Sequence, residues 1–287
     1  MSRIIYCNGR YVSYGDAMIH AEDRGFQFGD AIYEVCEVIG GRLVDETRHM
    51  DRLERSLHEL QMPQPMSRRA WSRVLRETIR RNRLDYGSVY LQVSRGAAPR
   101  DFLFPAKGTP NSVVVIARSG NQAATDERAT KGIAVKTVPD NRWERCDIKT
   151  VMLLPASLAK EAAKAEGAKE AWFVDTDGRI TEGASSNAWI VDAAGTLVTR
   201  PITNEILKGV TRTTLIDVLT AEGVRFEERA FSVAEAQTAR EAFITSAGNG
   251  VMPVTSIDGV SIGNGVPGLL SVKLRAAFHK IAEFAAA

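Results

Sequence analysis

A lysine with an acidic neighbour stands just before an apolar run near the middle of the chain. Asp147, Ile148 and Lys149 stand just ahead of residues 151–154, which are all apolar. In an extended strand, residues two apart share a face, so Asp147 and Lys149 are expected to point the same way. Burial lowers the pKa of an amine and leaves more of the neutral form that attacks carbonyl groups. Lys149 is therefore a candidate catalytic amine, and an ordinary lysine at a strand end is the alternative.

Carbonyl chemistry at a lysine needs further groups, and three later stretches could provide them. Glu182 follows a predicted strand and turn, and a carboxylate beside a pyridine nitrogen keeps that nitrogen protonated, which makes the ring an electron sink. Val210 and Thr211 follow Gly209 at the start of a predicted helix, whose free N–H groups could bind a phosphate. Residues 245–250 form a second loop of small residues that could bind an anion. Each stretch alone is also typical of a surface turn or an ordinary helix start.

The spacing of apolar residues predicts the elements that position these candidates. Asn8-Gly9 predicts a hairpin within residues 3–12, and Gly25 with Gly29 predicts an irregular segment over residues 23–30. Ser67 is expected to cap a helix. Strands are predicted over residues 31–39, 89–94, 112–117, 133–138, 170–175, 188–191, 196–199 and 242–245. Helices are predicted over residues 45–60, 67–83, 155–166, 210–222 and 269–285.

This order of elements predicts a mixed α/β protein of the α+β type with two domains. The first is a smaller N-terminal α/β domain, residues 1–118. Residues 119–131 are small and polar and are predicted to be an interdomain linker. Residues 132–287 are predicted to form a larger, strand-rich C-terminal domain.

The composition excludes several classes of protein. The 287 residues are 44% hydrophobic and 25% charged with a net charge of +2, which is typical of a globular protein and does not favour nucleic acid as a partner. The arginines between Arg68 and Arg83 have helical spacing and predict a solvated helix face. No apolar run is long enough for a membrane span, and no signal-peptide core follows the first residues.

The cysteines and histidines do not form a metal-binding or disulfide pattern. Cys7, Cys36 and Cys146 are odd in number and far apart, which fits reduced thiols in a cytoplasmic protein. The four histidines are scattered, and His49 is expected to lie on a helix surface. We therefore expect a soluble cytoplasmic protein without a bound metal.

Taken in order, the candidate motifs resemble the fold-type IV pyridoxal-phosphate enzymes, which include the D-amino acid and branched-chain aminotransferases and aminodeoxychorismate lyase. The resemblance rests on Lys149, Glu182-Gly183, Leu207-x-Gly209-x-Thr211-Arg212, the loop at Ser246, residues 23–30, His49-x-x-Arg52-Leu53 and Cys146-Asp147-Ile148-Lys149. It covers nearly the whole chain. An ordered set of this kind is specific, although each motif alone is not.

The resemblance implies pyridoxal 5'-phosphate as the cofactor, a C-terminal pseudo-barrel domain and a homodimer. It implies that Lys149 binds the cofactor covalently and later carries the substrate's Cα proton, and that Glu182 pairs with the ring nitrogen. Leu207 is expected to pack on the ring face. The phosphate is expected to be held by Arg52, by the backbone of Val210 and Thr211, and by the loop at Ser246 and Ala247.

Substrate-side residues look most like those of the D-amino acid aminotransferases, in which a Tyr, an Arg and a His bind the substrate α-carboxylate, the Arg and His coming from the other subunit. Tyr33 and Arg100 match this trap, whereas Phe102 stands where the histidine is expected. The arginine can still bind a carboxylate through two hydrogen bonds. Ala247 stands where relatives often have a threonine, so backbone amides must make that phosphate contact. The expected reaction is transfer of an amino group from a D-amino acid such as D-alanine to a 2-oxo acid such as 2-oxoglutarate.

Alternatives to this reaction remain. A branched-chain L-amino acid aminotransferase or an aminodeoxychorismate lyase could use the same cofactor site, because these enzymes differ in their substrate-side residues. A non-enzymatic protein that binds a small ligand is the other class. Arg142 and Arg145 are expected to serve ion pairs or the domain interface.

Overall fold

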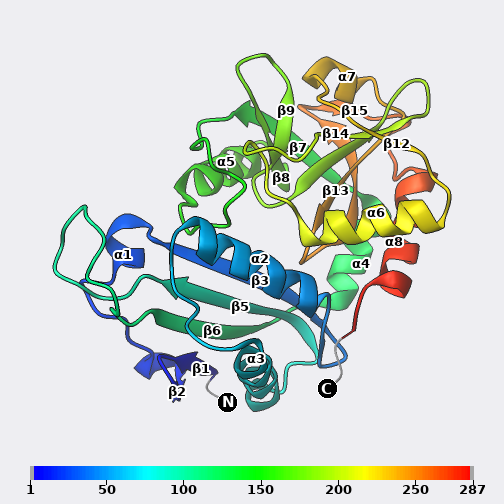
Figure 1. Ribbon diagram of the computed structural model, residues 1–287. Coiled ribbons are helices and arrows are strands. Elements are labelled where there is room, and N and C mark those ends of the chain that lie inside the picture. Colours follow the sequence, from blue (N-terminus) through cyan, green and yellow to red (C-terminus); the bar gives the residue numbers. More distant parts are fainter. Residues whose placement is uncertain (1–2, 285–287) are drawn as a thin grey trace. The chain divides into compact units, whose positions relative to one another are not determined.

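The computed structural model describes residues 3–284, which divide into two compact units (Figure 1). The first unit runs through Gln122, takes in Ile148–Met152 and includes the chain from Glu283. The second contains Ala123–Asp147 and Leu153–Ala282. Neither unit is a continuous stretch of chain, and the segment that carries Lys149 belongs to the first.

The first unit is built on a six-stranded sheet in the order β2-β1-β6-β5-β3-β4, with every pair antiparallel. Its strands are β1 (Ile4–Cys7), β2 (Arg10–Ser13), β3 (Ala31–Ile39), β4 (Arg42–Leu43), β5 (Tyr86–Ser94) and β6 (Ser112–Ser119). The predicted hairpin is confirmed: Asn8 and Gly9, with φ of 45° and 89°, turn the chain between β1 and β2. A short 3-10 helix follows at Tyr14–Asp16.

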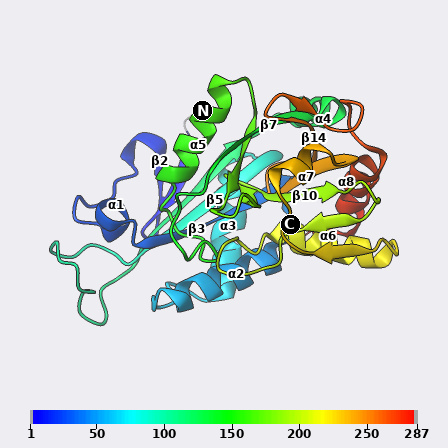
Figure 2. The same cartoon turned by 90° about the horizontal axis from the view of Figure 1, so that it is seen from above.

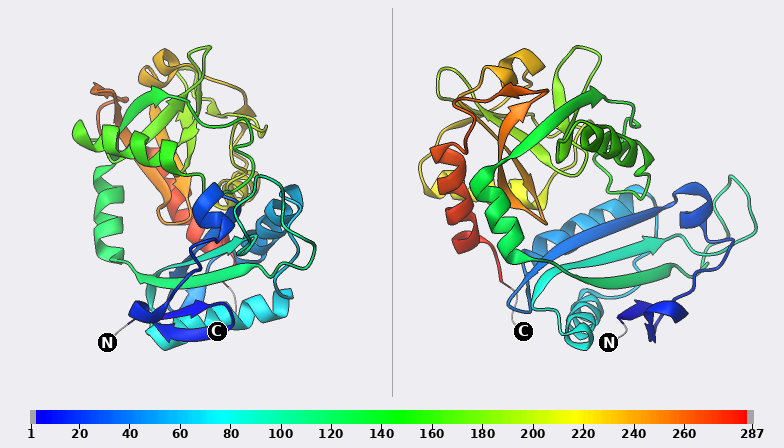
Figure 3. Two further views of the ribbon diagram at one scale, coloured as in Figure 1. Left: turned by 90° about the vertical axis from the view of Figure 1, so that its left-hand side faces the viewer. Right: turned by 180° about the vertical axis from the view of Figure 1, so that it is seen from behind.

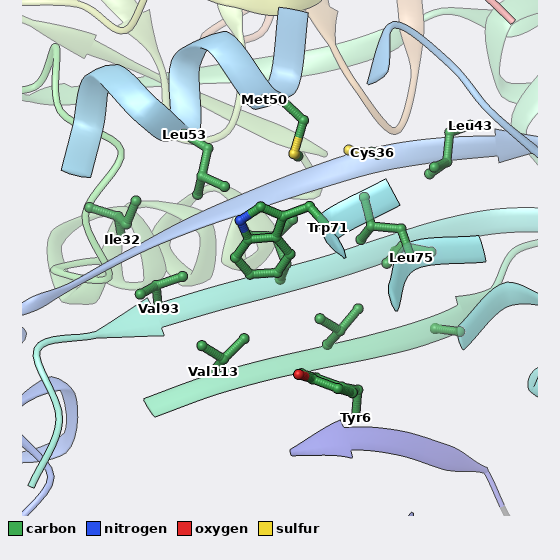
Figure 4. Close-up of a cluster of buried hydrophobic side chains, with 14 of the residues drawn as sticks. Tyr6, Ile32, Cys36, Leu43, Met50, Leu53, Trp71, Leu75, Val93 and Val113 are labelled. Carbon is green, nitrogen blue, oxygen red and sulfur yellow. The ribbon is translucent and has the colours of Figure 1, made fainter. Parts of the chain in front are cut away.

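Two amphipathic helices pack on this sheet. They are α2 (Glu46–Glu59) and α3 (Arg68–Asn82), close to their predicted bounds, and the Ser67 hydroxyl caps α3 by accepting from the Ala70 N–H at 3.3 Å. Figure 4 shows Met50 and Leu53 of α2 and the Trp71 ring of α3 in one cluster with strand residues. Burial of this cluster is the main stabilising contribution in the first unit.

Residues 23–30 are not irregular as predicted, because they contain the short helix α1 (Arg24–Phe28). The Asp23 carboxylate accepts from the Gly25 N–H at 2.9 Å and starts the helix, and Gly29 ends it in a left-handed conformation with φ of 69°. Gly25 and Gly29 therefore mark the two ends of a short helix and not an irregular loop.

The second unit contains a nine-stranded mixed sheet in the order β12-β11-β10-β13-β14-β7-β8-β9, with β15 paired to β14. The strands are β7 (Ile133–Pro139), β8 (Glu170–Val174), β9 (Ile180–Gly183), β10 (Asn187–Val191), β11 (Leu197–Thr199), β12 (Phe226–Glu228), β13 (Glu241–Ser246), β14 (Gly250–Ile257) and β15 (Val260–Ser261). The pairs β7–β8, β7–β14 and β11–β12 are parallel, and the others are antiparallel. This mixed sheet confirms the predicted fold class.

Five helices accompany this sheet: α4 (Gln122–Lys131), α5 (Leu154–Ala165), α6 (Val210–Ala221), α7 (Val233–Gln237) and α8 (Leu269–Ile281). Figure 2 shows α5 along β7, and α6 and α8 pack against each other. In Figure 3, α8 lies beside α4, where Arg275 pairs with Asp126 at 2.9 Å. The stretch 119–131, predicted to be an irregular linker, is thus mostly helical, because its alanines and long polar side chains favour helix.

Candidate functional site

Lys149 lies in the first unit, beside strand β3. The Tyr33 N–H donates to the Lys149 carbonyl at 3.0 Å, and the Val151 N–H donates to the Ala31 carbonyl at 3.1 Å. Apart from one bridge between Ile32 and Thr150, the segment is not a strand, so the expected alternation of side chains does not apply. Its neighbour Asp147 accepts instead from Arg145, at 2.9 Å and 3.0 Å, within the second unit.

The apolar run after Lys149 does not bury the amine as predicted, because Met152, Leu153 and Leu154 are 47%, 38% and 70% exposed. A tyrosine lies against the amine instead. The Lys149 Nζ lies 3.2 Å from the Tyr33 hydroxyl and 4.2 Å from the centroid of its ring. The structure therefore brings together two of the predicted site residues.

Tyr33 is held in place by a second tyrosine. Its ring stacks on that of Tyr90, with centroids 5.6 Å apart and planes at 27°. Burial raises the pKa of Tyr90 to about 12, so this residue is a neutral phenol at physiological pH. The stacked pair limits the positions that the Tyr33 hydroxyl, and hence the Lys149 amine, can take.

Arg52, a predicted phosphate ligand, is fixed by a buried carboxylate. Glu34 is fully buried, and its Oε1 accepts from Arg52 Nε at 2.7 Å. Its Oε2 accepts from Arg52 Nη2 at 2.8 Å and also lies 2.7 Å from His49 Nδ1. Burial alone would raise the pKa of Glu34, but Arg52 and His49 lower it to about 2. His49 is only 2% exposed, so its predicted place on the helix surface is wrong.

Glu34 was not recognised from the sequence as a site residue, although a signal was present. It is in phase with Ile32, Cys36 and Val38, the buried side chains of β3. A carboxylate at such a position requires a buried cation, which α2 provides.

The predicted substrate residues Arg100 and Phe102 lie in the exposed loop between β5 and β6. Arg100 is exposed, and its guanidinium lies 5.2 Å from the Phe28 ring and 5.7 Å from the Phe102 ring. Phe102 is 81% exposed. Within residues 3–284, no hydrogen bond joins Arg100 to Tyr33, whereas Tyr33 is bonded to Lys149.

Glu182 lies in the second unit, near the end of β9, where three groups donate to it. Arg142 Nη1 lies 2.5 Å from Oε1, Asn187 Nδ2 lies 3.0 Å from Oε2, and the Leu207 N–H reaches both oxygens at 3.1–3.2 Å. Arg142 also binds Asp140, through Nε at 2.9 Å and Nη2 at 2.7 Å. The prediction that Arg142 serves ion pairs is confirmed, and the buried Glu182 is held as an oriented anion.

Asn187, at the start of β10, joins Glu182 to the start of α6. Its Nδ2 also donates to the Leu207 carbonyl at 3.0 Å. A Cβ atom on Gly209 would lie 2.1 Å from Asn187 Oδ1, so only glycine fits there. The sequence alone does not show this role of Asn187, because Leu207 and Gly209 lie far from it along the chain.

The first turn of α6 has unused donors. The hydrogen bonds of this helix begin with the Thr213 N–H, which donates to the Gly209 carbonyl at 3.0 Å. Among the residues that the structure describes, neither the N–H groups of Val210 and Thr211 nor the Thr211 hydroxyl has a hydrogen-bond partner. Val210 and Thr211 are themselves buried, so these donors are suited to an anion.

The loop at Ser246 provides similar donors nearby. Thr245 pairs with Asn187 across β13 and β10, so the loop leaves the sheet beside the residue that touches α6. Asn249 Nδ2 donates to Ser246 Oγ at 3.0 Å. Over residues 3–284, the N–H groups of Ala247 and Gly248 form no backbone hydrogen bond. The structure thus gathers Glu182, the start of α6 and this loop around Asn187.

Comparison with known proteins places these residues in a family. The sequence pattern of the family described as Amino-transferase class IV matches residues 31–257. The chain is 35% identical over 279 residues to the D-alanine aminotransferase of Staphylococcus haemolyticus, covering 97% of this chain and 98% of that protein. It is 37% identical over 272 residues to the D-alanine aminotransferase of Bacillus licheniformis, covering 95% and 94%.

Solved structures of aminotransferases have the same fold. The branched-chain amino acid aminotransferase of Escherichia coli superposes with a TM-score of 0.89 at 24% identity, covering 98% of this chain and 95% of that one. A hypothetical aminotransferase from Mycobacterium tuberculosis, in its PLP-bound form, gives a TM-score of 0.85 at 21% identity, covering 97% and 98%. At this identity the likeness concerns the fold alone.

Proposed function

This chain belongs to the class IV aminotransferase family of pyridoxal-phosphate enzymes, and we propose that it moves the amino group of a D-amino acid such as D-alanine to a 2-oxo acid such as 2-oxoglutarate. The observation that carries the proposal is the Lys149 amine, 3.2 Å from the Tyr33 hydroxyl. An amine beside a carboxylate-binding candidate has the groups that transamination needs at the substrate Cα.

The donors and charges of the described residues fit pyridoxal phosphate. The cofactor, when bound, withdraws electrons and so stabilises negative charge on the substrate Cα. Glu182 is an ionised, oriented acceptor and would pair with the ring nitrogen. Leu207 would pack on the ring face. The phosphate would be held by Arg52, by the unused N–H groups of Val210, Thr211, Ala247 and Gly248, and by the hydroxyls of Thr211 and Ser246.

Lys149 would act twice through the same atom. Its Nζ would bind the cofactor covalently, and once the substrate amine replaces it, Nζ would take the proton from Cα. The Tyr33 hydroxyl, stacked in place by Tyr90, would keep Nζ oriented and donate to the substrate carboxylate. Arg100 would bind the same carboxylate through its guanidinium, and Phe102 contributes no donor.

We also propose a cytoplasmic homodimer. The resemblance implies that Arg100 acts in the partner's site, and the exposed Phe26, Phe102 and Phe104 side chains offer an apolar surface that a second copy would cover. The free thiols of Cys7, Cys36 and Cys146 support a reducing compartment. None of the helices within residues 3–284 combines the length and the hydropathy that a membrane span needs. Light scattering on the purified protein should give twice the chain mass, and a monomer would contradict the dimer.

The reaction can be tested on purified protein loaded with pyridoxal phosphate. We expect a visible absorption band that D-alanine bleaches and L-alanine does not, and pyruvate formation when D-alanine and 2-oxoglutarate are supplied together. Chiral chromatography should identify the second product as D-glutamate. Bleaching by L-leucine alone would show that Tyr33 and Arg100 were misinterpreted, and the lack of any band would contradict the role of Lys149.

A further inference from the structure

A buried ion cluster lies beneath the loop that carries Arg100 and Phe102. We name Asp30, Arg24 and Arg95 the Asp30 cluster. We propose that it positions Arg100 for the substrate carboxylate, so that Asp30 and Arg24 determine affinity for the substrate although neither touches it. This inference rests on the function proposed above.

The cluster itself is tightly paired. Asp30 Oδ2 accepts from Arg24 Nε at 2.8 Å and from Arg95 Nε at 2.7 Å, and Arg95 Nη2 donates to Oδ1 at 3.0 Å. The side chains of Arg24, Asp30 and Arg95 are 4%, 10% and 8% exposed. Removing one partner from a buried pair leaves an uncompensated charge, so each member depends on the others.

Arg24 connects the cluster to the backbone of the loop. Its Nη1 donates to the carbonyls of Asp101 at 2.6 Å and Leu103 at 3.3 Å, which are the residues on either side of Phe102. The Asp101 carboxylate also accepts from the Leu103 N–H at 3.1 Å. The backbone that presents Phe102 is therefore fixed at both flanks by a residue that Asp30 orients.

Arg95 secures the other side of the same loop. Its guanidinium lies 3.7 Å from the centroid of the Phe104 ring, and its Nη2 donates to the Leu60 carbonyl at 2.7 Å. A cation over an aromatic face is attracted to it. Although Phe104 is 57% exposed, it is thus held against the buried cluster.

Two aromatic rings connect the fixed loop backbone to the Arg100 guanidinium. The Phe28 ring lies 4.4 Å from the Arg24 guanidinium and 5.2 Å from that of Arg100. Phe102 packs edge-on against Phe28 at 5.9 Å and lies 5.7 Å from Arg100. Phe102, in place of the expected histidine, therefore gives up a donor and contributes a ring that orients the arginine.

An oriented arginine loses less conformational entropy when it binds a carboxylate, so the cluster should lower the KM for substrate. Two variants test this. Asp30→Asn keeps the shape and removes the charge that both arginines need, whereas Arg24→Met removes the donors to the loop and leaves the pair of Asp30 with Arg95 intact. The matched control is Glu46→Gln, which breaks a partly buried pair with Arg76 in the same unit, away from the loop.

For Arg24→Met and Asp30→Asn we expect KM for D-alanine to rise about tenfold or more with kcat changed less than about threefold, because displaced binding groups weaken affinity before chemistry. The inhibition constant of propionate, which has the carboxylate but no amine, should rise by the same factor. The absorption spectrum of the bound cofactor should not change. Glu46→Gln should leave all three measurements at their original values.

A second readout needs no enzymatic activity. Trypsin cleaves after arginine, so the fragment that ends at Arg100 should appear faster in Arg24→Met and Asp30→Asn than in the original protein or in Glu46→Gln. Unchanged cleavage, or a loss of kcat with unchanged KM and propionate inhibition, would overturn the proposal. If the original protein did not transaminate D-alanine, the proposed function would fail, and the cleavage would still report whether the cluster holds the loop.

Discussion

Glu34 is a single carboxylate at an apolar position of β3, and it decides how Arg52 and His49 are used. Both of its oxygens accept hydrogen bonds from Arg52, so the guanidinium is held in one orientation and cannot turn toward another carboxylate. Lys149 and Glu182 could be singled out as candidate site residues from residue types and motif order, and their chemistry stays a prediction. The contacts of Glu34 and Asn187 could not be predicted, because each is defined by partners that are distant in sequence.

The depressed pKa of Glu34 predicts a pH-dependent stability. A carboxylate whose pKa falls from 4.5 to about 2 on folding adds stability above the unfolded value, and this is lost as the pH falls from about 4.5 through about 2. The size is about 3 kcal/mol in the free energy of unfolding. Urea titrations between these pH values should show the loss in the original protein and not in Glu34→Gln, which should be destabilised at neutral pH by about 3 kcal/mol.

Lys149 has its own prediction at this scale. Lys149→Ala should remain folded, with the free energy of unfolding within about 1 kcal/mol, because the amine is only partly buried. It should lack the visible band and lose activity by about a thousandfold or more, because Nζ is both anchor and base. Lys131→Ala, which removes an exposed lysine of α4, is the control. Full activity in Lys149→Ala would contradict the assignment.

At the scale of elements, the sequence predicted the helices whose apolar residues recur with a strong helical period. Helices α2, α3, α5, α6 and α8 were all anticipated. Strand β14 was missed because Gly250 and Pro253 interrupt its pattern, yet Pro253 pairs with Phe243 in β13. The helix α4 was missed because small and polar residues suggested a linker, and its amphipathic pattern is weak.

Contact between β10 and the start of α6 gives a prediction at this scale. Gly209 has an ordinary φ of −61°, so Gly209→Ala adds no backbone strain, but its Cβ would collide with Asn187 Oδ1. Asn187 should then move away from Glu182 and Leu207, which should lower stability by about 1–3 kcal/mol and weaken pyridoxal phosphate binding.

The matched control for that substitution is Gly15→Ala, where an added Cβ meets nothing within 4 Å. Thermal unfolding and fluorescence titration with the cofactor would measure both effects. Equal behaviour of the two variants would mean that Asn187 does not couple the strand to the helix.

At the scale of the whole molecule, each compact unit is assembled from stretches that are separated along the chain. The first unit needs Ile148, which is 4% exposed in its core, and the backbone bonds from Tyr33 to Lys149 and from Val151 to Ala31. The order of predicted strands and helices changes only once, near residue 120. It therefore could not show that residues 148–152 rejoin the first unit. The return depends on hydrogen bonds that periodicity does not encode.

A fragment of residues 1–122 should therefore be incomplete. We expect the Tyr33 amide, which bonds to Lys149 in the full chain, to exchange with deuterium much faster in the fragment, while amides between β5 and β6 remain protected. Hydrogen exchange followed by mass spectrometry or NMR would measure this. Equal protection of Tyr33 in both proteins would show that the first unit folds without its returning segment.

The segment Ile148–Met152, which returns to the first unit, also limits which recombinants between related genes can fold and function. A crossover near codon 122 would join β3 of one parent to the Lys149 segment of another, although the two are hydrogen-bonded neighbours. Tyr33 and Lys149 would then come from different lineages and meet for the first time in the recombinant. Functional descendants should therefore carry matched versions of residues 31–33 and 148–152, so that an ancestral exchange between genes would leave its trace as correlated changes in these two short stretches.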